Sequence, residues 1–287
     1  MTDRVGVRKT YKLYIGGAFP RSESGRSYPA VGPGGDILAR PARGSRKDLR
    51  EAVVSARGAW KGWAGATAYN RGQILYRVAE LMEGRREQFV AELMRSGSEE
   101  AEREVDASID RWVWYAGWSD KVHHVMGTVN PVAGPYYNFT FPEPTGVVGV
   151  VAPEEPALLG LVSRLAPAVV SGNTVVVLAS ESKPLPAVTL TEVLATSDVP
   201  GGVINVLTGY KRELVPWLAG HMDVNAIDLT GVPDDLGAEA EEAAAGNVKR
   251  TVRAANGPAE WFADAAQSPY AVTDFMEMKT VWHPMGA

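Results

Sequence analysis

The sequence predicts an α/β fold in which a doubly wound, mostly parallel sheet follows a layer of helices. Short apolar runs rich in valine and isoleucine occur at residues 146–151, 174–178, 203–207 and 226–229. Each run is followed by turn residues and a helical segment, which is typical of parallel strands that are covered on both faces. Between residues 45 and 118, apolar residues recur at helical spacing. This periodicity predicts the helical layer.

Residues 1–44 are predicted to form an N-terminal arm outside the core. The segment is rich in Gly, Pro and Ser, and its residues alternate between apolar and polar at 11–15. This alternation predicts a short edge strand, which ends in a turn at Gly16 and Gly17.

The helical layer is predicted to contain three amphipathic helices. Ser45 and Asp48 have the spacing of a capping box, so the first helix is expected to begin there. The second helix is predicted over 70–95 and the third from 98 to 118, each with one apolar stripe that faces the core.

Extended structure is predicted outside the four apolar runs as well. From Asn130 to Phe141, aromatic and β-branched residues alternate with Pro and Gly, which favours a hairpin at a sheet edge. Two further short strands are predicted at 247–254 and 260–262, where they would complete the open sheet.

Composition excludes several classes of protein. The chain has 287 residues, 29 basic and 34 acidic side chains, and a formal net charge of −5. Interspersed charges of both signs argue against a nucleic-acid partner. No apolar run reaches the length of a membrane span, and the first residues lack the apolar core of a signal peptide. A cytoplasmic protein without membrane contact is therefore expected.

The chain contains no cysteine. This excludes a thiolate nucleophile, a thiol redox pair and a disulfide scaffold. The adjacent His123 and His124 would point about 100° apart on a helix and could not share a metal ion. No metal site is predicted.

Four motifs, in order along the chain, resemble those of the aldehyde dehydrogenase superfamily. They read RWVWYAGWSDK at 111–121, EPTGVVGVVAP at 143–153, LAPAVVSGNT at 165–174 and PGGVINVLTG at 200–209. The similarity extends from about residue 11 to 264 and resumes at 273–283.

The resemblance implies a sheet that binds NAD or NADP, a separate catalytic domain with a cysteine nucleophile, and a hairpin and C-terminal strand that build the oligomer. Here the sequence passes from the end of the coenzyme-type domain directly to the tail, so the catalytic domain is expected to be absent. The predicted organisation is an N-terminal arm at 1–44, a Rossmann-like coenzyme-type domain at 45–129 and 143–266, and oligomerisation elements at 130–142 and 267–287.

The positions that would carry catalysis in this family are degenerate. The oxyanion turn, where an asparagine amide should donate, reads PEEP and offers Glu154 or Glu155 instead. A solvated loop carboxylate and a glutamate that acts as a base are both open interpretations. Ala254 takes the place of the glutamate general base, and a methyl group cannot accept a proton. No catalytic residue is predicted.

The first cofactor position matches the family only in part. The motif that should hold the adenosine ribose keeps Glu181 but has Leu178 in place of the lysine. Glu181 either accepts from ribose hydroxyls or lies near a helix N-terminus. Lys183, five residues after Leu178, could take the place of the missing lysine.

The phosphate-binding turn keeps Gly231 but has Val232 in place of its hydroxyl residue. Asp234 and Asp235, expected as N-cap residues, add negative charge where a diphosphate should bind. Glu181 and Gly231 are the remaining cofactor-binding candidates. The main expectation is no cofactor; the alternative is weakened binding of NAD or NADP.

Three hypotheses of function follow. The first is a non-catalytic structural or regulatory subunit that forms a hetero-oligomer with a full-length aldehyde dehydrogenase through 130–142 and 273–284. A partner of that kind would supply the catalytic-domain sheet that a copy of this chain does not offer. The alternative is an NAD(P)-binding oxidoreductase component that acts on aldehydes with residues supplied by a partner subunit. A degraded fragment is the third, and the preserved apolar stripes argue against it.

Overall fold

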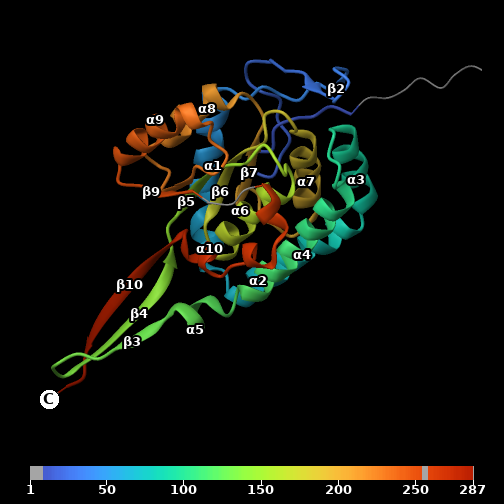
Figure 1. Cartoon of the computed structure of the whole chain (residues 1–287). Helices are drawn as coiled ribbons and strands as arrows, with labels where there is room; N and C mark the ends of the chain where they lie inside the picture. Colours follow the sequence, from blue (N-terminus) through green and yellow to red (C-terminus); the bar gives the residue numbers. More distant parts are fainter. Residues whose placement is uncertain (1–8, 254–257, 287) are drawn as a thin grey trace, which may run out of the picture.

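A five-stranded parallel sheet forms the centre of the protein (Figure 1). The computed structural model describes residues 9–253 and 258–286. The strand order is β7-β6-β5-β8-β9, so the chain winds outward from β5 first to one side and then to the other. This order confirms the doubly wound fold and places a crevice at the carboxyl ends of β5 and β8, where the winding reverses. The strands are β5 (Val147–Val151), β6 (Thr174–Leu178), β7 (Ile204–Leu207), β8 (Ala226–Asp228) and β9 (Arg250–Val252).

Helices cover both faces of this sheet because successive side chains of each strand point to opposite faces. Val148 and Val150 belong to the apolar core on one face, while Val147 and Val151 belong to the core on the other. The first face is covered by α6 (Leu159–Val170), α7 (Leu185–Thr196) and the helical layer, and the second by α8 (Lys211–Ala219), α9 (Asp234–Ala245) and α1 (Arg46–Gly65).

The first predicted helix begins where expected, but it packs mainly on the other face of the sheet, so the prediction that it belongs to one layer with the next helices is wrong. The rest of the layer contains one break more than expected. The Ser45 hydroxyl accepts from the backbone N–H of Lys47 and Asp48, and the reciprocal contact completes the capping box of α1. The single helix predicted over 70–95 is wrong, because the chain turns at Gly84 and divides it in two. The layer comprises α2 (Ala68–Glu83), α3 (Arg86–Arg95), α4 (Ala101–Trp118) and the short α5 (Val122–Met126).

The N-terminal arm adds β1 (Ala30–Val31) and β2 (Ile37–Ala39), which pair with each other. Tyr14 forms an antiparallel bridge with Val206, so the predicted edge segment lies beside β7. The prediction that the arm lies outside the core is wrong for this segment, because Leu13 and Tyr14 are buried in the core on the two faces of the sheet and attach the arm to it.

The connection between the sheet and the tail is helical. The strand predicted at 260–262 is wrong: these residues belong to the 3-10 helix η1 (Pro258–Phe262), followed by η2 (Asp264–Ala266) and α10 (Tyr270–Thr273). The buried guanidinium of Arg111 explains this, because it donates to the carbonyls of Trp261 at 3.0 Å and Ala266 at 2.8 Å and so takes acceptors that a strand would need. The buried side chains of Val272 and Phe275 fix the connection to the main core.

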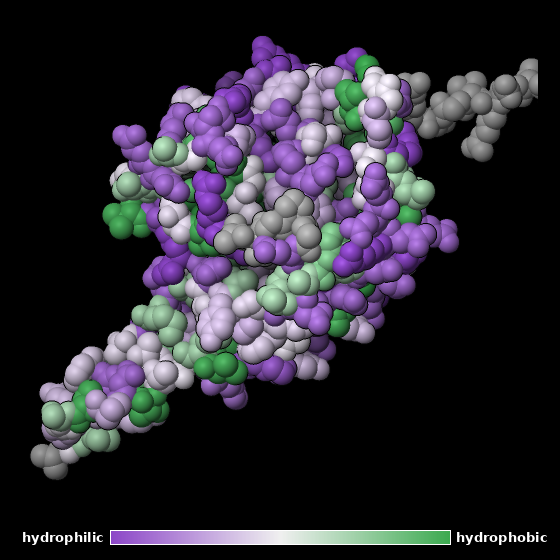
Figure 2. Space-filling model, in the orientation of Figure 1, coloured by the Kyte–Doolittle hydropathy of each residue, from purple (hydrophilic) through white to green (hydrophobic). Residues whose placement is uncertain are grey.

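A three-stranded antiparallel sheet projects from this body (Figures 1 and 2). It contains β3 (Thr128–Asn130), β4 (Tyr136–Pro144) and β10 (Met276–Pro284), in the order β10-β4-β3. β10 pairs with β4 along its whole length, from Met276 opposite Pro144 to Pro284 opposite Tyr136. The predicted hairpin and C-terminal strand therefore form one sheet. Among the described residues, no helix is long and apolar enough to cross a membrane.

Candidate functional site

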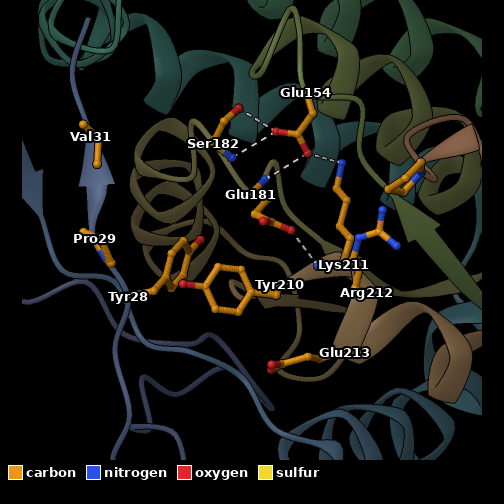
Figure 3. Close-up of a pocket in the computed structure, with 11 residues that line it drawn as sticks. Tyr28, Pro29, Val31, Glu154, Glu181, Ser182, Tyr210, Lys211, Arg212 and Glu213 are labelled. Atoms are coloured by element: carbon orange, nitrogen blue, oxygen red, sulfur yellow. Dashed lines mark hydrogen bonds and ion pairs between the residues drawn. The ribbon is translucent and has the colours of Figure 1, made fainter. Parts of the chain in front are cut away.

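The candidate site lies at the carboxyl ends of the parallel strands, beside a cavity of about 720 Å³ (Figure 3). Glu154 follows β5, residues 180–182 follow β6, Lys211 follows β7 and Gly231 follows β8. The carboxyl ends of parallel strands meet at one edge of a sheet, so side chains distant in sequence converge there. The cavity is lined by Tyr28, Pro29, Val31, Glu154, Glu181, Ser182, Tyr210, Lys211, Arg212, Glu213 and Pro233.

Glu154 is the most heavily bonded group of the site. Its Oε2 accepts from the Ser182 hydroxyl at 2.6 Å, the Ser182 backbone N–H at 3.0 Å and the Ser180 hydroxyl at 2.8 Å. Its Oε1 accepts from the backbone N–H of Glu181 at 3.1 Å and forms an ion pair with Lys211. Glu154 is therefore not simply a solvated loop carboxylate: its side chain is 42% exposed, but both of its oxygens are bonded within the protein.

Lys211 is a buried cation whose residue is only 2% exposed. Besides Glu154, its Nζ donates to the carbonyls of Ala152 at 2.7 Å and Gly231 at 2.9 Å. An ammonium has three N–H donors, and these three acceptors use all of them. Burial lowers the pKa of Lys211, while the charge of Glu154 opposes that change.

These contacts govern the ionisation of Glu154. Burial by itself would raise the pKa of its carboxyl group, but the Lys211 charge and the hydrogen bonds from Lys211 and Ser182 outweigh burial and lower it to about 2. A glutamate with such a pKa is ionised at neutral pH but is a weak base, poorly matched to general-base catalysis near pH 7.

We expect the stabilisation that Glu154 contributes to be pH-dependent. Its pKa is depressed in the folded state relative to the ordinary value of 4.5, so its contribution is present above that pH and is lost as the pH falls toward about 2. The stability difference between the wild type and Glu154→Gln, measured by urea unfolding from pH 7 down to pH 3, should therefore shrink with acidification. The control is Glu155→Gln, whose exposed carboxylate should give only a small difference at any pH. A difference for Glu154→Gln that is constant over this range would contradict the expectation.

The two neighbouring glutamates have separate partners. Glu155 is exposed and pairs with Lys183, with 2.6 Å between Nζ and Oε1. Lys183 is thus directed to Glu155 and not to Glu181. Glu181 accepts from the backbone N–H of Lys211 at 2.8 Å, so its carboxylate caps the N-terminus of α8. Glu181 thus lies at a helix N-terminus, as one of its two interpretations expects; contact with a cofactor ribose stays a prediction.

The phosphate-binding turn is closed against the sheet. The N–H of Gly231 donates to the carbonyl of Val151 at 2.9 Å, and a Cβ added at Gly231 would lie 2.0 Å from the carbonyl oxygen of Ala152. The prediction of Asp234 and Asp235 as N-cap residues is wrong, because Pro233 takes that position and both aspartates lie in the first turn of α9. Asp235 forms an ion pair with Arg212 at 2.6 Å.

In this arrangement the residues do not fit the diphosphate of a dinucleotide. The ammonium of Lys211 has no donor left for a phosphate oxygen, and Glu154 places a carboxylate beside it. The backbone of Gly231 lies directly against the end of β5, which leaves no space between the two segments at that point. Two further negative charges lie in the first turn of α9.

The remaining predicted positions add no reactive group. Ala254 lies outside the described residues. Among the described residues, no three His, Asp or Glu side chains come together as metal ligands. His123 is exposed at the surface, and partial desolvation of its ring lowers its pKa.

Sequence reasoning missed Lys211, Ser180 and Ser182 as members of the site. Each of them follows the carboxyl end of a predicted parallel strand, as Glu154 and Gly231 do. That shared position was the available signal, because such strand ends converge in this fold.

Comparison with known proteins places these features in a family. Residues 19–279 match the model of the aldehyde dehydrogenase family. The chain is 33% identical over 268 residues to human retinal dehydrogenase 2, covering 90% of this chain and 51% of the relative. It is 33% identical over 230 residues to the mitochondrial aldehyde dehydrogenase family 2 member B4 of Arabidopsis thaliana, covering 78% and 42%. The chain thus spans about half the length of the curated relatives it matches.

Solved structures agree with this assignment. The NAD+ complex of aldehyde dehydrogenase from Bacillus cereus superposes with a TM-score of 0.80 at 26% identity, covering 85% of this chain and 50% of that one. HpcC from Thermus thermophilus superposes with a TM-score of 0.80 at 29% identity, covering 85% and 47%. The sheet and its covering helices correspond to the coenzyme-binding half of these structures.

Proposed function

Because the chain belongs to the aldehyde dehydrogenase family but has no cysteine, we propose that it is a non-catalytic subunit which binds a full-length aldehyde dehydrogenase. Catalysis by a covalent thiol intermediate requires a thiolate, and both glutamates of the oxyanion turn are held in ion pairs, Glu154 with Lys211 and Glu155 with Lys183. What the chain does retain is a surface suited to assembly.

The observation that carries this proposal is the projecting sheet of β3, β4 and β10. On one of its faces the rings of Tyr137, Phe139 and Phe141 form a ladder with centroids 5.3 and 5.9 Å apart. Residues directly opposite in an antiparallel sheet share a face, so Val129 and Val281, both opposite Phe139, extend the ladder sideways. Tyr137 is 44% exposed although it is part of this apolar face. Such a surface on a projection supports contact with another protein.

The edge of β10 supports the same proposal. Within the described residues, β10 pairs with β4 on one side only, and most of its side chains are exposed. An unpaired strand edge is a template to which another chain can add a strand. The catalytic-domain sheet of a full-length aldehyde dehydrogenase is the acceptor we propose.

Co-expression with a full-length aldehyde dehydrogenase from the same genome tests the proposal. We expect the two chains to co-elute in size-exclusion chromatography at micromolar concentration. Replacing Phe139 with serine should weaken the complex by at least about tenfold, because it removes the centre of the aromatic ladder. The matched control is Tyr76→Ser, which removes an exposed aromatic side chain from α2, away from the projecting sheet. Separate elution of the two wild-type chains would contradict the proposal.

A further inference from the structure

We infer that the crevice contains a complete anion-binding site which the chain's own Glu154 occupies, and that this site accepts the phosphate group of a phosphate monoester when Glu154 is removed. The donors are the hydroxyls of Ser180 and Ser182, the backbone N–H groups of Glu181 and Ser182, and the ammonium of Lys211. In the wild type, Glu154 is therefore a tethered competitor that keeps phosphate ligands out.

The donor set has the features of an anion site. Two successive backbone N–H groups, at 181 and 182, converge on one carboxylate from the turn after β6. Successive N–H groups that point to one place form an anion-binding concavity. Ser180 and Lys211 are 1% and 2% exposed, so the charge and a hydroxyl act where water screens them least.

Phosphate is the anion that suits these donors. Five donor groups from two segments surround Glu154, and Figure 3 shows Ser182, the backbone nitrogen of Glu181 and the ammonium of Lys211 directed toward it. A phosphate group offers three strong acceptor oxygens, one more than a carboxylate. Lysine binds phosphate as a point charge. A phosphate in this position would accept from the five donor groups with three oxygens, whereas Glu154 accepts from them with two.

The adjoining cavity gives room for the rest of a phosphate monoester. Glu154, Ser182 and Lys211 line the cavity of about 720 Å³ together with the rings of Tyr28 and Tyr210. These two rings lie 5.3 Å apart between centroids. An aromatic and largely apolar wall of this kind suits a flat organic group attached to the phosphate.

Tethering explains why Glu154 prevails in the wild type. A group held in position by its own chain competes at a high effective concentration, so a free ligand must displace it at a disadvantage. An incoming phosphate would also meet the Glu154 charge before it met the donors. We therefore expect the wild type to show no phosphate binding in the millimolar range.

Removal of Glu154 tests the inference. Calorimetric titration of the 287-residue chain carrying Glu154→Ala with inorganic phosphate should show binding at least tenfold tighter than in the wild type, together with phosphate-dependent thermal stabilisation. Sodium chloride at equal ionic strength separates this from a general salt effect. AMP and NAD, titrated in the same way, report whether the cavity accepts the organic part of a monoester or of a diphosphate.

Two matched variants make the test specific. Glu155→Ala removes the neighbouring exposed carboxylate and should give no gain of phosphate binding. Glu154→Ala combined with Ser182→Ala removes the competing carboxylate together with one donor hydroxyl, and should lose most of the gain. If Glu154→Ala does not fold, Glu154→Ser also withdraws the carboxylate from the donors while keeping a short polar side chain, and it should show the same gain.

Certain results would overturn the inference. They are a folded Glu154→Ala or Glu154→Ser chain without phosphate binding, an equal gain in Glu155→Ala, or wild-type binding as tight as that of the variant. The readout uses the isolated chain, so it stands or falls independently of the partner experiment above.

Discussion

Replacing Arg164 with methionine is expected to lower the free energy of unfolding by about 3 to 5 kcal/mol. Arg164 lies on α6, its side chain is 6% exposed, and its Nε forms an ion pair with Asp228, whose side chain is fully buried at the end of β8. Removing the guanidinium leaves the Asp228 charge buried without its partner, which is the costly case for a buried pair. Urea unfolding at pH 7 measures the loss.

The same substitution should also loosen the connection to the tail. The Nη2 of Arg164 lies 3.5 Å from a carboxylate oxygen of Asp274, and its guanidinium lies over the ring of Phe275. Amide hydrogen exchange in the segment that contains these two residues should therefore increase.

Two controls separate this effect from a general loss of charge. Combining Arg164→Met with Asp228→Leu removes both charges and should recover most of the stability. Arg77→Ala breaks an exposed pair with Glu80 on α2 and should change stability by less than about 0.5 kcal/mol. A loss below about 1 kcal/mol for Arg164→Met would contradict the expectation.

Gly231→Ala is expected to destabilise the protein by about 3 kcal/mol. The added Cβ would lie 2.0 Å from the carbonyl oxygen of Ala152 and 2.6 Å from the backbone nitrogen of Pro153. These are backbone atoms that cannot rotate away. Relief requires the turn after β8 to separate from β5, which stretches the two hydrogen bonds of Lys211 that join their carbonyls. The unfolding free energy in urea measures the effect.

Gly58→Ala makes the same substitution at another position and is expected to increase the free energy of unfolding. Gly58 lies inside α1, and its added Cβ would meet no atom within 4 Å. Alanine favours a helix interior over glycine, so a gain of up to about 1 kcal/mol is expected. If both variants change the free energy of unfolding in the same direction, the close backbone approach at Gly231 does not determine the effect of Gly231→Ala.

The strands of the main sheet could be predicted because their signal is local and strong. Val175, Val176 and Val177 are all fully buried, and such runs mark strands covered on both faces. The break between α2 and α3 was missed because the apolar period continues across Gly84. The strand predicted around Trp261 failed for a different reason. Trp261 is buried, but Arg111, 150 residues away in sequence, takes the carbonyl that a strand would have used.

The site was less predictable than the fold. Glu154 could be recognised as a departure from its family, but its partner Lys211 lies 57 residues away along the chain and is one lysine among many basic residues in the sequence. Nothing in the local pattern distinguishes a lysine that is 2% exposed from one in solvent. Only the convergence of strand ends in three dimensions selects it.

The pairing of β10 with β4 has a consequence for synthesis on the ribosome. The partner of Pro144 is Met276, so more than 100 residues separate the completion of β4 from the arrival of the strand that covers its edge. At about 5 to 20 residues per second, the nascent chain carries an open aromatic strand for several seconds or longer. Because β10 follows β9 in the sequence, the complete projecting sheet can form only after all strands of the parallel sheet have been synthesised. A partner that recognises the complete projecting sheet therefore binds only those chains in which β10 has already been synthesised.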